Sequence, residues 1–283
     1  MKRIGIIAKL TKPEAVKASH DVIKWLVEQG VEVYLDTELG GRLNWPKSYS
    51  RTELPELAEL MVVLGGDGAM LYTARLIGEK KIPILGVNLG GLGFLTAITM
   101  EEIYPVLERV IRDDFGTEER MMLNVEIHRE GGKASKYTVL NDVVIKSQLA
   151  RLVSVEVRIN KEYVTTYRAD GLIVSTPTGS TGYSLSAGGP ILYPTIHSII
   201  VVPICPFNLT NRPVVIPDWM TVEILLKADH ANILLTMDGQ VDLPLKGGDV
   251  VEVKRSDSSV YLVKCPGKSY FDILRERLMW GGK

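Results

Sequence analysis

The sequence has few of the residues that build metal sites and disulfide frameworks. Its cysteines and histidines are Cys205, Cys265, His20, His128, His197 and His230. None of them stands at the spacing of a zinc site or of a His-x-x-x-His pair, so a metal held by these side chains is not expected. Two cysteines in 283 residues fit a reducing cytosol, and we interpret both as small buried hydrophobic residues rather than nucleophiles.

An excess of charge of one sign is also missing. The 33 Lys and Arg residues nearly balance the 34 Asp and Glu residues, which leaves a net charge of -1 at pH 7. Such a chain offers no general surface for nucleic acid or membranes, so any polyanion must be bound locally. No apolar run approaches the length of a membrane span, and the segment Met1 to Leu10 is too short for a signal peptide. We expect a cytoplasmic protein.

Two common nucleotide-binding motifs are absent from the chain. It contains neither Gly-x-x-x-x-Gly-Lys-Ser/Thr nor Gly-x-Gly-x-x-Gly. Their absence argues against the standard P-loop and Rossmann chemistries. Any phosphate-binding turn must therefore follow another pattern.

The first 113 residues predict an α/β domain with a Rossmann-like open parallel sheet. Apolar runs typical of buried strands alternate with amphipathic segments. The expected strands are Arg3 to Ala8, Val31 to Leu35, Leu60 to Leu64 and Ile82 to Val87. Thr11 to Glu14 and Thr99 to Glu102 have capping-box spacing before expected helices, the second of which runs to about Arg112 with Pro105 in its first turns. Residues 36–55 are interpreted as a long connection.

Residues 114–267 predict a separate all-β domain resembling a sandwich, because short alternating runs and turn residues replace the helical pattern. The expected strands are Asn124 to His128, Lys136 to Lys146, Val153 to Ile159, Tyr163 to Arg168, Ile199 to Ile204, Thr221 to Lys227, Asn232 to Met237, Val250 to Lys254 and Val260 to Lys264. Gly131-Gly132 and Asn160-Lys161 are expected hairpin turns. A final helix over Phe271 to Trp280, within residues 268–283, is expected to pack back on the first domain.

A glycine-rich tetrapeptide, Gly65-Gly66-Asp67-Gly68, follows the run Leu60 to Leu64. Ligands of open α/β sheets bind beyond the carboxyl ends of strands, and glycines let backbone N–H groups approach phosphate oxygens. An acid there repels a polyphosphate unless it has a task, such as accepting the proton of an attacking hydroxyl. An ordinary turn explains the tetrapeptide equally well, so both interpretations stay open.

A second glycine-rich segment, Asn88-Leu89-Gly90-Gly91-Leu92-Gly93-Phe94-Leu95, follows the next expected strand. Two such turns can flank one ligand. The glycines by themselves slightly favour a simpler interpretation, in which they only permit a tight crossover.

Hydroxyl groups crowd the segment 170–190. They can donate to phosphate, ribose or adenine without adding charge, and Tyr183 offers a face for stacking. The hydroxyl-bearing residues are Thr178, Ser180, Thr181, Ser184 and Ser186. Because an apolar strand precedes the segment, we interpret it as a ligand loop rather than a serine-rich surface loop.

Asn141 and Asp142 lie inside the β-rich run Val139 to Ile145. Two polar residues in the middle of a strand are costly unless one face is wet or binds a ligand, so they are candidates for ribose or a base edge. An exposed bulge or turn is an equally good explanation. Met237-Asp238-Gly239-Gln240 contains the Asp-Gly pair typical of a hairpin turn.

Taken together and in this order, these motifs closely resemble the NAD kinase family. The specific part is segment 170–190, because Gly-Gly-Asp-Gly also occurs in diacylglycerol and sphingosine kinases. The resemblance implies transfer of the terminal phosphoryl group of ATP to the adenosine 2'-hydroxyl of NAD, with Mg2+, to give NADP. It also implies a homodimer or homotetramer and, in some members, inorganic polyphosphate as donor.

The resemblance also implies roles for individual residues. Asp67 matches the general base that receives the 2'-hydroxyl proton, beside Gly68, while Asn141 and Asp142 match the pair that holds adenine and ribose. The further NAD contacts that it implies are Arg151, Arg168, Asp170, Thr178, Thr181, Gly182, Tyr183, Ser184, Ser186 and Gln240. The phosphate-binding turns that it implies use Gly65, Gly66, Gly68, Asn88, Gly90, Gly91 and Gly93. Arg168 and Asp170 match positions near the nicotinamide half that can reach a neighbouring subunit. No direct protein cage for a metal is implied, and Mg2+ is expected with ATP.

Two positions depart from the family pattern. Ala69 stands where Thr or Ser is frequent, which removes a hydroxyl near the phosphates, and Gly182 stands where many members have Ala. Neither residue is the general base that the resemblance implies, so the two departures do not contradict the resemblance to the NAD kinase family. Its rivals are a lipid kinase sharing Gly-Gly-Asp-Gly, which leaves segment 170–190 unexplained, and a non-catalytic dinucleotide sensor, in which the acid is dispensable.

Overall fold

The chain divides into two compact units. Unit 1 comprises Met1–Glu119 and Val260–Lys283, and unit 2 comprises Arg120–Ser259. The structure, a computed structural model, describes residues 1–10, 13–90, 93–129, 131–132, 134–149, 151–227 and 233–280. Of the predicted features, Gly91, Asn232 and the start of the first capping box lie outside the described residues.

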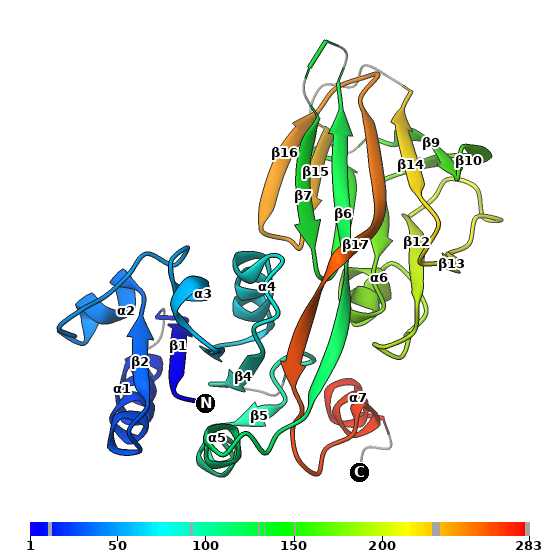
Figure 1. The fold of residues 1–283 in the computed structure, drawn as a ribbon. Helices are drawn as coiled ribbons and strands as arrows, with labels where there is room; N and C mark the ends of the chain where they lie inside the picture. The colour runs from blue at the N-terminus through cyan, green and yellow to red at the C-terminus, as the bar shows by residue number, and fades with distance from the viewer. Residues whose placement is uncertain are drawn as a thin grey trace. The chain divides into compact units, whose positions relative to one another are not determined.

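Unit 1 is built on a parallel sheet with the strand order β2, β1, β3, β4 (Figure 1). Its strands are β1 (Arg3–Ala8), β2 (Glu32–Leu35), β3 (Leu60–Leu64), β4 (Ile84–Asn88) and β5 (Ile98–Thr99). Its helices are α1 (Pro13–Glu28), α2 (Thr37–Arg42), α3 (Leu54–Leu57), α4 (Asp67–Ile77), α5 (Ile103–Ile111) and α7 (Tyr270–Leu278). Strand β5 and the end of β17 (Val250–Val263) also pair in parallel with β4. The prediction of an open parallel sheet with helices is confirmed.

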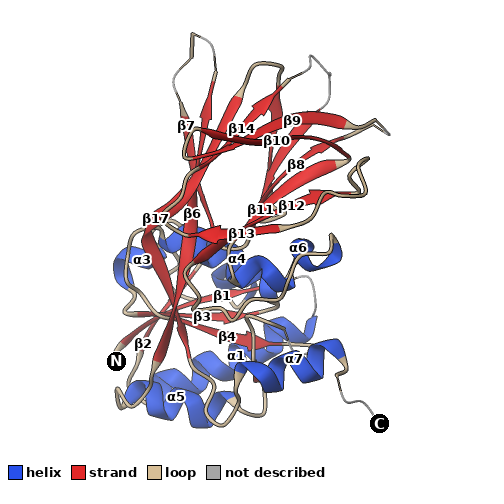
Figure 2. Cartoon of the chain, turned by 90° about the vertical axis from the view of Figure 1, so that its right-hand side faces the viewer, coloured by secondary structure: helices blue, strands red, loops and turns tan. Residues whose placement is uncertain are grey.

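Helices cover both faces of this sheet, with α3 and α4 on one side and α1 and α5 on the other (Figure 2). Along each strand, successive residues pack alternately on the two faces of the sheet. Val62 and Leu85 join the core that also contains residues of α1 and α5. Gly86 instead packs against α4, where a Cβ atom at this position would lie 2.7 Å from Sδ of Met70. Because both faces are covered, the run Leu60–Leu64 is buried throughout.

Unit 2 is an antiparallel β-sandwich, as predicted. One sheet contains β6 (Thr117–His128), β7 (Ser135–Val139), β9 (Val153–Ile159), β10 (Glu162–Ala169), β14 (Val222–Leu226) and β17. The other contains β8 (Asp142–Ser147), β11 (Gly171–Ser175), β12 (Ser198–Ile204), β13 (Val214–Pro217), β15 (Ile233–Met237) and β16 (Val241–Leu245). One hydrophobic core joins both sheets, with Val155 from the first and Leu172 from the second among its members. This shared core is what a sandwich requires.

The prediction that residues 36–55 form only a long connection was wrong. The segment contains α2 and the start of α3, and the buried Asp36 organises it. Oδ1 of Asp36 accepts a hydrogen bond of 2.7 Å from the N–H of Leu39, and Oδ2 accepts one of 2.7 Å from Nε of Arg51. The first contact caps α2 and the second ties Arg51 to the cap residue, so a polar segment acquires helical structure.

The predicted strand Lys136 to Lys146 is two strands in different sheets. Strand β7 pairs with β6, whereas β8 pairs with β11 and β15. Asn141 and Asp142 therefore lie at the point where the chain leaves one sheet and enters the other, and not in the middle of a strand. The two polar residues stand where the ladder is interrupted.

Three further expectations were wrong. The strands predicted at Val250 to Lys254 and Val260 to Lys264 are one continuous strand, β17, which pairs with β14 at one end, with β4 at the other, and with β6. Cys205, expected to be buried, is exposed. The hydroxyl-rich segment, expected to be a loop, contains a short 3-10 helix, η1 (Thr178–Thr181), and the short helix α6 (Tyr183–Ser186).

Candidate active site

The Gly65–Gly68 turn joins the carboxyl end of β3 to the start of α4. Gly66 is the N-cap, in extended conformation with φ -104° and ψ -171°, and Asp67 is the first helical residue. The start of a helix presents backbone N–H groups and the positive end of the helix dipole, an arrangement that binds anions. The turn therefore has the local structure of a phosphate site.

The carboxylate of Asp67 binds the second glycine-rich segment. Its Oδ2 accepts a hydrogen bond of 2.9 Å from the N–H of Phe94, and its Oδ1 accepts one of 3.0 Å from the N–H of Leu95. The hydroxyl of Thr96 donates to Oδ1 at 3.1 Å. A carboxylate has about four acceptor sites. Among the described residues three donors are present, and the remaining acceptor site is on Oδ2.

Asn88 extends this network. Its Nδ2 donates to Oγ1 of Thr96 at 2.7 Å, and its Oδ1 accepts from the N–H of Gly90 at 2.7 Å. Thr96 thus accepts from Asn88 and donates to Asp67, so its single hydroxyl proton is directed at the carboxylate. A Cβ atom at Gly93 would lie 2.1 Å from Oδ1 of Asp67, so only glycine fits there. The structure brings the two glycine-rich turns together through Asp67.

In unit 2, Asn141 and Asp142 are held by Asp238, whose carboxylate accepts hydrogen bonds from the N–H groups of Leu140, Asn141 and Asp142. The side-chain Oδ1 of Asn141 is buried and has no partner within the described part of the chain. The carboxyl of Asp142 is also buried. An acceptor without a partner is costly when it is buried, so it marks a place where a ligand donor would bind.

The hydroxyl-rich segment packs directly on these residues. The N–H of Thr176 donates to the carbonyl of Asn141 at 2.9 Å, and its Oγ1 donates to the carbonyl of Leu140 at 2.6 Å. Gly179 allows this approach, since a Cβ atom there would lie 2.2 Å from the Asn141 carbonyl oxygen. A Cβ atom at Gly182 would lie 3.8 Å from Oδ2 of Asp142. The structure therefore brings Asn141, Asp142 and η1 together.

The other hydroxyls of the segment differ in exposure. Thr178 and Ser184 are buried, and Oγ of Ser184 has no partner in the described structure, whereas Tyr183 and Ser186 are exposed. Thr181 is half-buried and its hydroxyl donates to the carbonyl of Thr178 at 3.4 Å. Only part of the segment thus presents groups to solvent or to a ligand.

Two predicted NAD contacts lie far from the Asn141–Asp142 pair, and two others are exposed residues that lie next to strands of the same sheet. Arg168 and Asp170 stand before β11, whose far end, Ser175, pairs with Asp142. At about 3.3 Å per residue, the strand separates Asp170 from Asp142 by roughly 15 to 20 Å. Arg151 is exposed beyond β8, and the exposed Gln240 follows the β15–β16 turn. The structure does not bring Arg168 and Asp170 to the Asn141–Asp142 pair.

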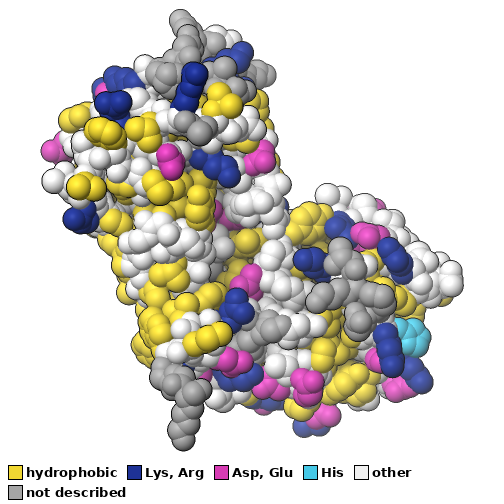
Figure 3. All heavy atoms as spheres, turned by 180° about the vertical axis from the view of Figure 1, so that it is seen from behind, with side chains coloured by type: hydrophobic (Ala, Val, Ile, Leu, Met, Phe, Trp, Pro, Cys, Tyr) yellow, Lys and Arg dark blue, Asp and Glu magenta, His cyan; other side chains and the backbone are white. Residues whose placement is uncertain are grey.

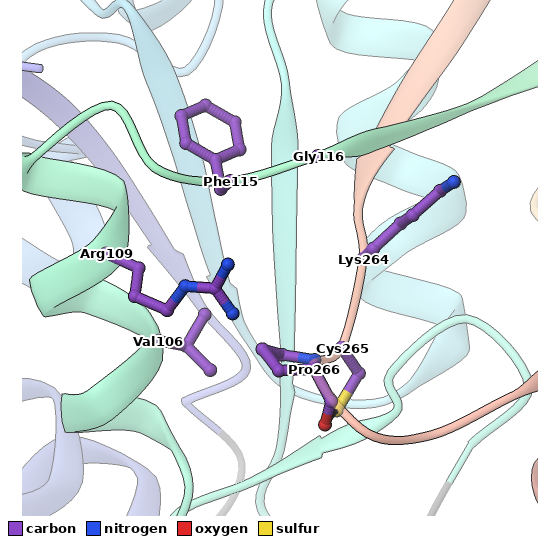
Figure 4. Close-up of a pocket in the computed structure, with 7 residues that line it drawn as sticks. All are labelled: Val106, Arg109, Phe115, Gly116, Lys264, Cys265 and Pro266. Carbon is purple, nitrogen blue, oxygen red and sulfur yellow. Dashed lines mark hydrogen bonds between the residues drawn. The ribbon is translucent and has the colours of Figure 1, made fainter.

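A cavity of about 280 Å³ lies in unit 1, lined by residues of α5, by the Phe115–Gly116 connection and by residues 264–266 (Figure 4). The side chain of Lys264 points away from the guanidinium of Arg109, so the cavity does not collect positive charge. None of the predicted site residues lines it.

The described residues hold no group of three or more His, Cys, Asp or Glu side chains that could hold a metal ion. Within the same residues, no helix is long and apolar enough to cross a membrane. Basic and acidic side chains are interspersed on the face shown in Figure 3.

Comparison with known proteins gives the family. Residues 4–115 match the model of the ATP-NAD kinase N-terminal domain, and residues 140–265 match that of the ATP-NAD kinase C-terminal domain. The chain is 48% identical to an NAD kinase of Geobacter sulfurreducens over 99% of both chains, and 45% identical to one of Geotalea daltonii over 99% of both. The chain belongs to the NAD kinase family.

Solved structures agree with this assignment. The structure of yeast NADH kinase complexed with NADH matches with a TM-score of 0.92 and 26% identity, over 100% of this chain and 89% of that one. An NAD kinase from Archaeoglobus fulgidus in complex with ATP shares the fold, with a TM-score of 0.76 and 24% identity, over 99% of this chain and 97% of that one.

Sequence reasoning missed three residues that contact the predicted site residues of this member of the NAD kinase family, one in unit 1 and two in unit 2. Thr96 orients Asp67, Asp238 holds Asn141 and Asp142, and the buried Arg120 lies 3.5 Å from the hydroxyl of Thr178. The Asp-Gly pair signalled the turn at Asp238 but gave no sign of its inward carboxylate. Thr96 directly follows the second motif, which was the only available signal for it.

We expect Asp142 to make the stability of the protein depend on pH. Burial, together with the charge of Asp238, raises the pKa of Asp142 from 3.8 to about 7. Between about pH 4 and pH 7 the unfolded chain therefore binds fewer protons than the folded one, and the free energy of unfolding falls as pH rises. Asp142→Asn, which cannot ionise, is expected to escape this loss.

Guanidinium unfolding at pH 5 and pH 8 measures the effect. We expect the stability of the variant relative to the natural protein to improve by roughly 1 to 3 kcal/mol between the two pH values. A relative stability that stays constant would contradict the assignment of the buried titration to Asp142.

Proposed function

We propose that the protein is an NAD kinase, a phosphotransferase with an alcohol acceptor, which moves the terminal phosphoryl group of ATP to the adenosine 2'-hydroxyl of NAD and forms NADP. The observation that carries the proposal is the carboxylate of Asp67. It stands at the start of α4 between two glycine-rich turns and keeps one acceptor site on Oδ2 beside its three donors. Membership of the family supports the same reaction.

The α/β region, residues 1–113, supplies the phosphate chemistry in this proposal. Backbone N–H groups of the turns holding Gly65, Gly66, Gly68, Asn88, Gly90, Gly91 and Gly93 bind the phosphates of ATP. The positive end of the α4 dipole adds to this binding. Phosphoryl transfer requires alignment and charge neutralisation more than covalent help, so a rigid pair of turns suits it.

Asp67 acts as the general base. We assign the 2'-hydroxyl proton to Oδ2, because Oδ1 already accepts two hydrogen bonds and Oδ2 only one. The hydroxyl of Thr96 and the N–H groups of Phe94 and Leu95 fix the orientation of the carboxylate. A base held in this way needs no reorganisation when the nucleophile attacks.

The β-rich region, residues 114–267, binds NAD. Asn141 and Asp142 hold adenosine, with Oδ1 of Asn141 as an acceptor that currently lacks a partner in the described structure. The remaining contacts come from Thr178, Thr181, Gly182, Tyr183, Ser184, Ser186, Arg151 and Gln240. Arg168 and Asp170 act on NAD held by a second copy in a homodimer or homotetramer, which agrees with their place at the other end of β11.

Mg2+ fits the site as a companion of ATP. The residues that the structure describes offer no cage of three acidic or histidine ligands, and Mg2+ commonly keeps several waters and binds substrate phosphates with one or two carboxylates. When bound, it would neutralise phosphate charge, and Asp67 is the carboxylate that the glycine-rich turns would offer to it. Polyphosphate, also a chain of phosphates, is an alternative donor for the same turns.

We place the protein in the cytoplasm, where its two free cysteines remain reduced.

The proposal is tested by incubating the purified protein with NAD, ATP and Mg2+ and detecting NADP with an NADP-specific dehydrogenase. We expect NADP to form and its formation to stop when EDTA removes the metal. Parallel reactions replace NAD with NADH and ATP with polyphosphate. Phosphorylation of diacylglycerol or sphingosine without NADP would favour a lipid kinase, and NAD binding without turnover would favour a sensor.

A further inference from the structure

Asp238 has more contacts than its turn requires. It lies between β15 and β16 with φ +50°, and Gly239 follows with φ +64°, so the pair forms a left-handed hairpin turn. Turn residues are usually exposed, but Asp238 is 5% exposed. Its side chain points into the protein, which the turn does not explain.

The carboxylate of Asp238 binds three consecutive backbone N–H groups. Oδ1 accepts from Asn141 at 2.7 Å and from Asp142 at 3.2 Å, and Oδ2 accepts from Leu140 at 3.1 Å. The N–H of Asp238 in turn donates to the carbonyl of Asp142 at 2.9 Å. Four hydrogen bonds thus tie the turn to the segment that we assign to adenosine.

The position of this segment explains the need for such an anchor. Between β7 and β8 the chain changes sheets, so residues 140–142 have no continuous ladder of strand hydrogen bonds. Buried N–H groups without partners are costly, and a single carboxylate satisfies three of them. The conformation of Asn141 and Asp142 therefore depends on a residue almost a hundred positions later in the chain.

The charge of Asp238 acts on the same segment. The side chain of Asp142 is buried beside it, and no ion pair to Asp142 occurs in the described part of the chain. A charged group of the same unit, Arg120 of β6, donates from Nη1 to the hydroxyl of Thr178 at 3.5 Å. Burial, together with the charge of Asp238, raises the pKa of Asp142 to about 7.

We propose that Asp238 is a positioning residue for NAD: it fixes Asn141 and Asp142 through three backbone N–H groups, and its carboxylate, beside the buried carboxyl of Asp142, disfavours a second negative charge there. The pair then presents one acceptor, Oδ1 of Asn141, and one donor, the carboxyl of Asp142. This inference rests on the proposed function.

Asp238→Asn tests the proposal, with Asp242→Asn as the matched control. Asp242 lies in the same hairpin and accepts a hydrogen bond from Thr236, but it is exposed. In Asp238→Asn the amide nitrogen faces a backbone N–H group, so one contact is lost and replaced by repulsion between donors. We expect the KM for NAD to rise about tenfold or more, with kcat within about threefold, and the control to match the natural protein.

The pH dependence of NAD binding, measured by calorimetry, separates a charge effect from a merely structural one. We expect a midpoint near pH 7 in the natural protein, which moves lower in Asp238→Asn because the repulsion on ionised Asp142 is gone, although burial still raises the pKa of Asp142. An unchanged KM overturns the positioning role. An unmoved midpoint overturns the role of the charge.

Asp142→Asn provides the second test, which applies even when Asp238→Asn does not fold. It must abolish the midpoint near pH 7, and a midpoint that persists overturns the proposal. Failure of the proposed function is recognised separately, because then the natural protein itself forms no NADP.

Discussion

Asp67→Asn is expected to lower kcat for NADP formation by about a hundredfold to ten-thousandfold, the range that a positioned general base contributes. The amide cannot accept the proton of the 2'-hydroxyl. Binding of NAD is expected to change only modestly, because proton transfer matters mainly in the transition state. Steady-state kinetics with the NADP-specific assay and separate calorimetric titration of NAD distinguish the two effects.

Thr96→Val is the control for this prediction, because Asp67 also anchors the second turn. The substitution removes the hydroxyl that donates to Oδ1 of Asp67 but leaves the carboxylate and its two backbone donors in place. We expect kcat to fall by about tenfold, the low end of the value of one hydrogen bond to a charged group. Equal losses of kcat in the two variants would contradict the role of Asp67 as general base and would leave it as an anchor of the second turn.

Gly179→Ala is the second substitution with a large expected effect. The new Cβ atom would lie 2.2 Å from the carbonyl oxygen of Asn141 and 2.5 Å from Oγ of Ser175. That carbonyl cannot retreat easily, because the N–H of Thr176 and the hydroxyl of Ser175 both donate to it. We expect the KM for NAD to rise at least about tenfold and stability to fall by about 1 to 3 kcal/mol, as in other overpacked sites.

Two glycines of the same unit provide a graded comparison. At Gly182 a Cβ atom would lie 3.2 Å from the carbonyl oxygen of Gly179, so Gly182→Ala is expected to cost less than Gly179→Ala. At Gly132 the nearest atom would be Cβ of Arg129 at 3.5 Å, an ordinary contact, so Gly132→Ala is expected to match the natural protein. Kinetics and thermal unfolding of the three variants check the order. Equal behaviour of all three would show that η1 does not need its close approach to Asn141.

The motifs differ in how far their local sequence determined their structure. The run Leu60–Leu64 followed by glycines predicted a buried strand and a turn at its carboxyl end, and the structure has both. Local preference gave wrong predictions for the polar run 36–55 and for the turn-forming residues inside β17. In the first case the buried Asp36 overrides it, and in the second case pairing with neighbouring strands does. Propensity is a weak guide wherever tertiary contacts compensate for it.

The sequence by itself determined the fold class and the family, because strand periodicity, glycine-rich turns and the segment 170–190 are local patterns of consecutive residues. The tertiary structure alone decided which groups meet. The donors to Asp67 come from 27 to 29 residues further along the chain, and Asp238 reaches back 96 to 98 residues to the segment 140–142. Such hydrogen bonds depend on where folding places separate strands, so they leave no periodic pattern from which a sequence can reveal them.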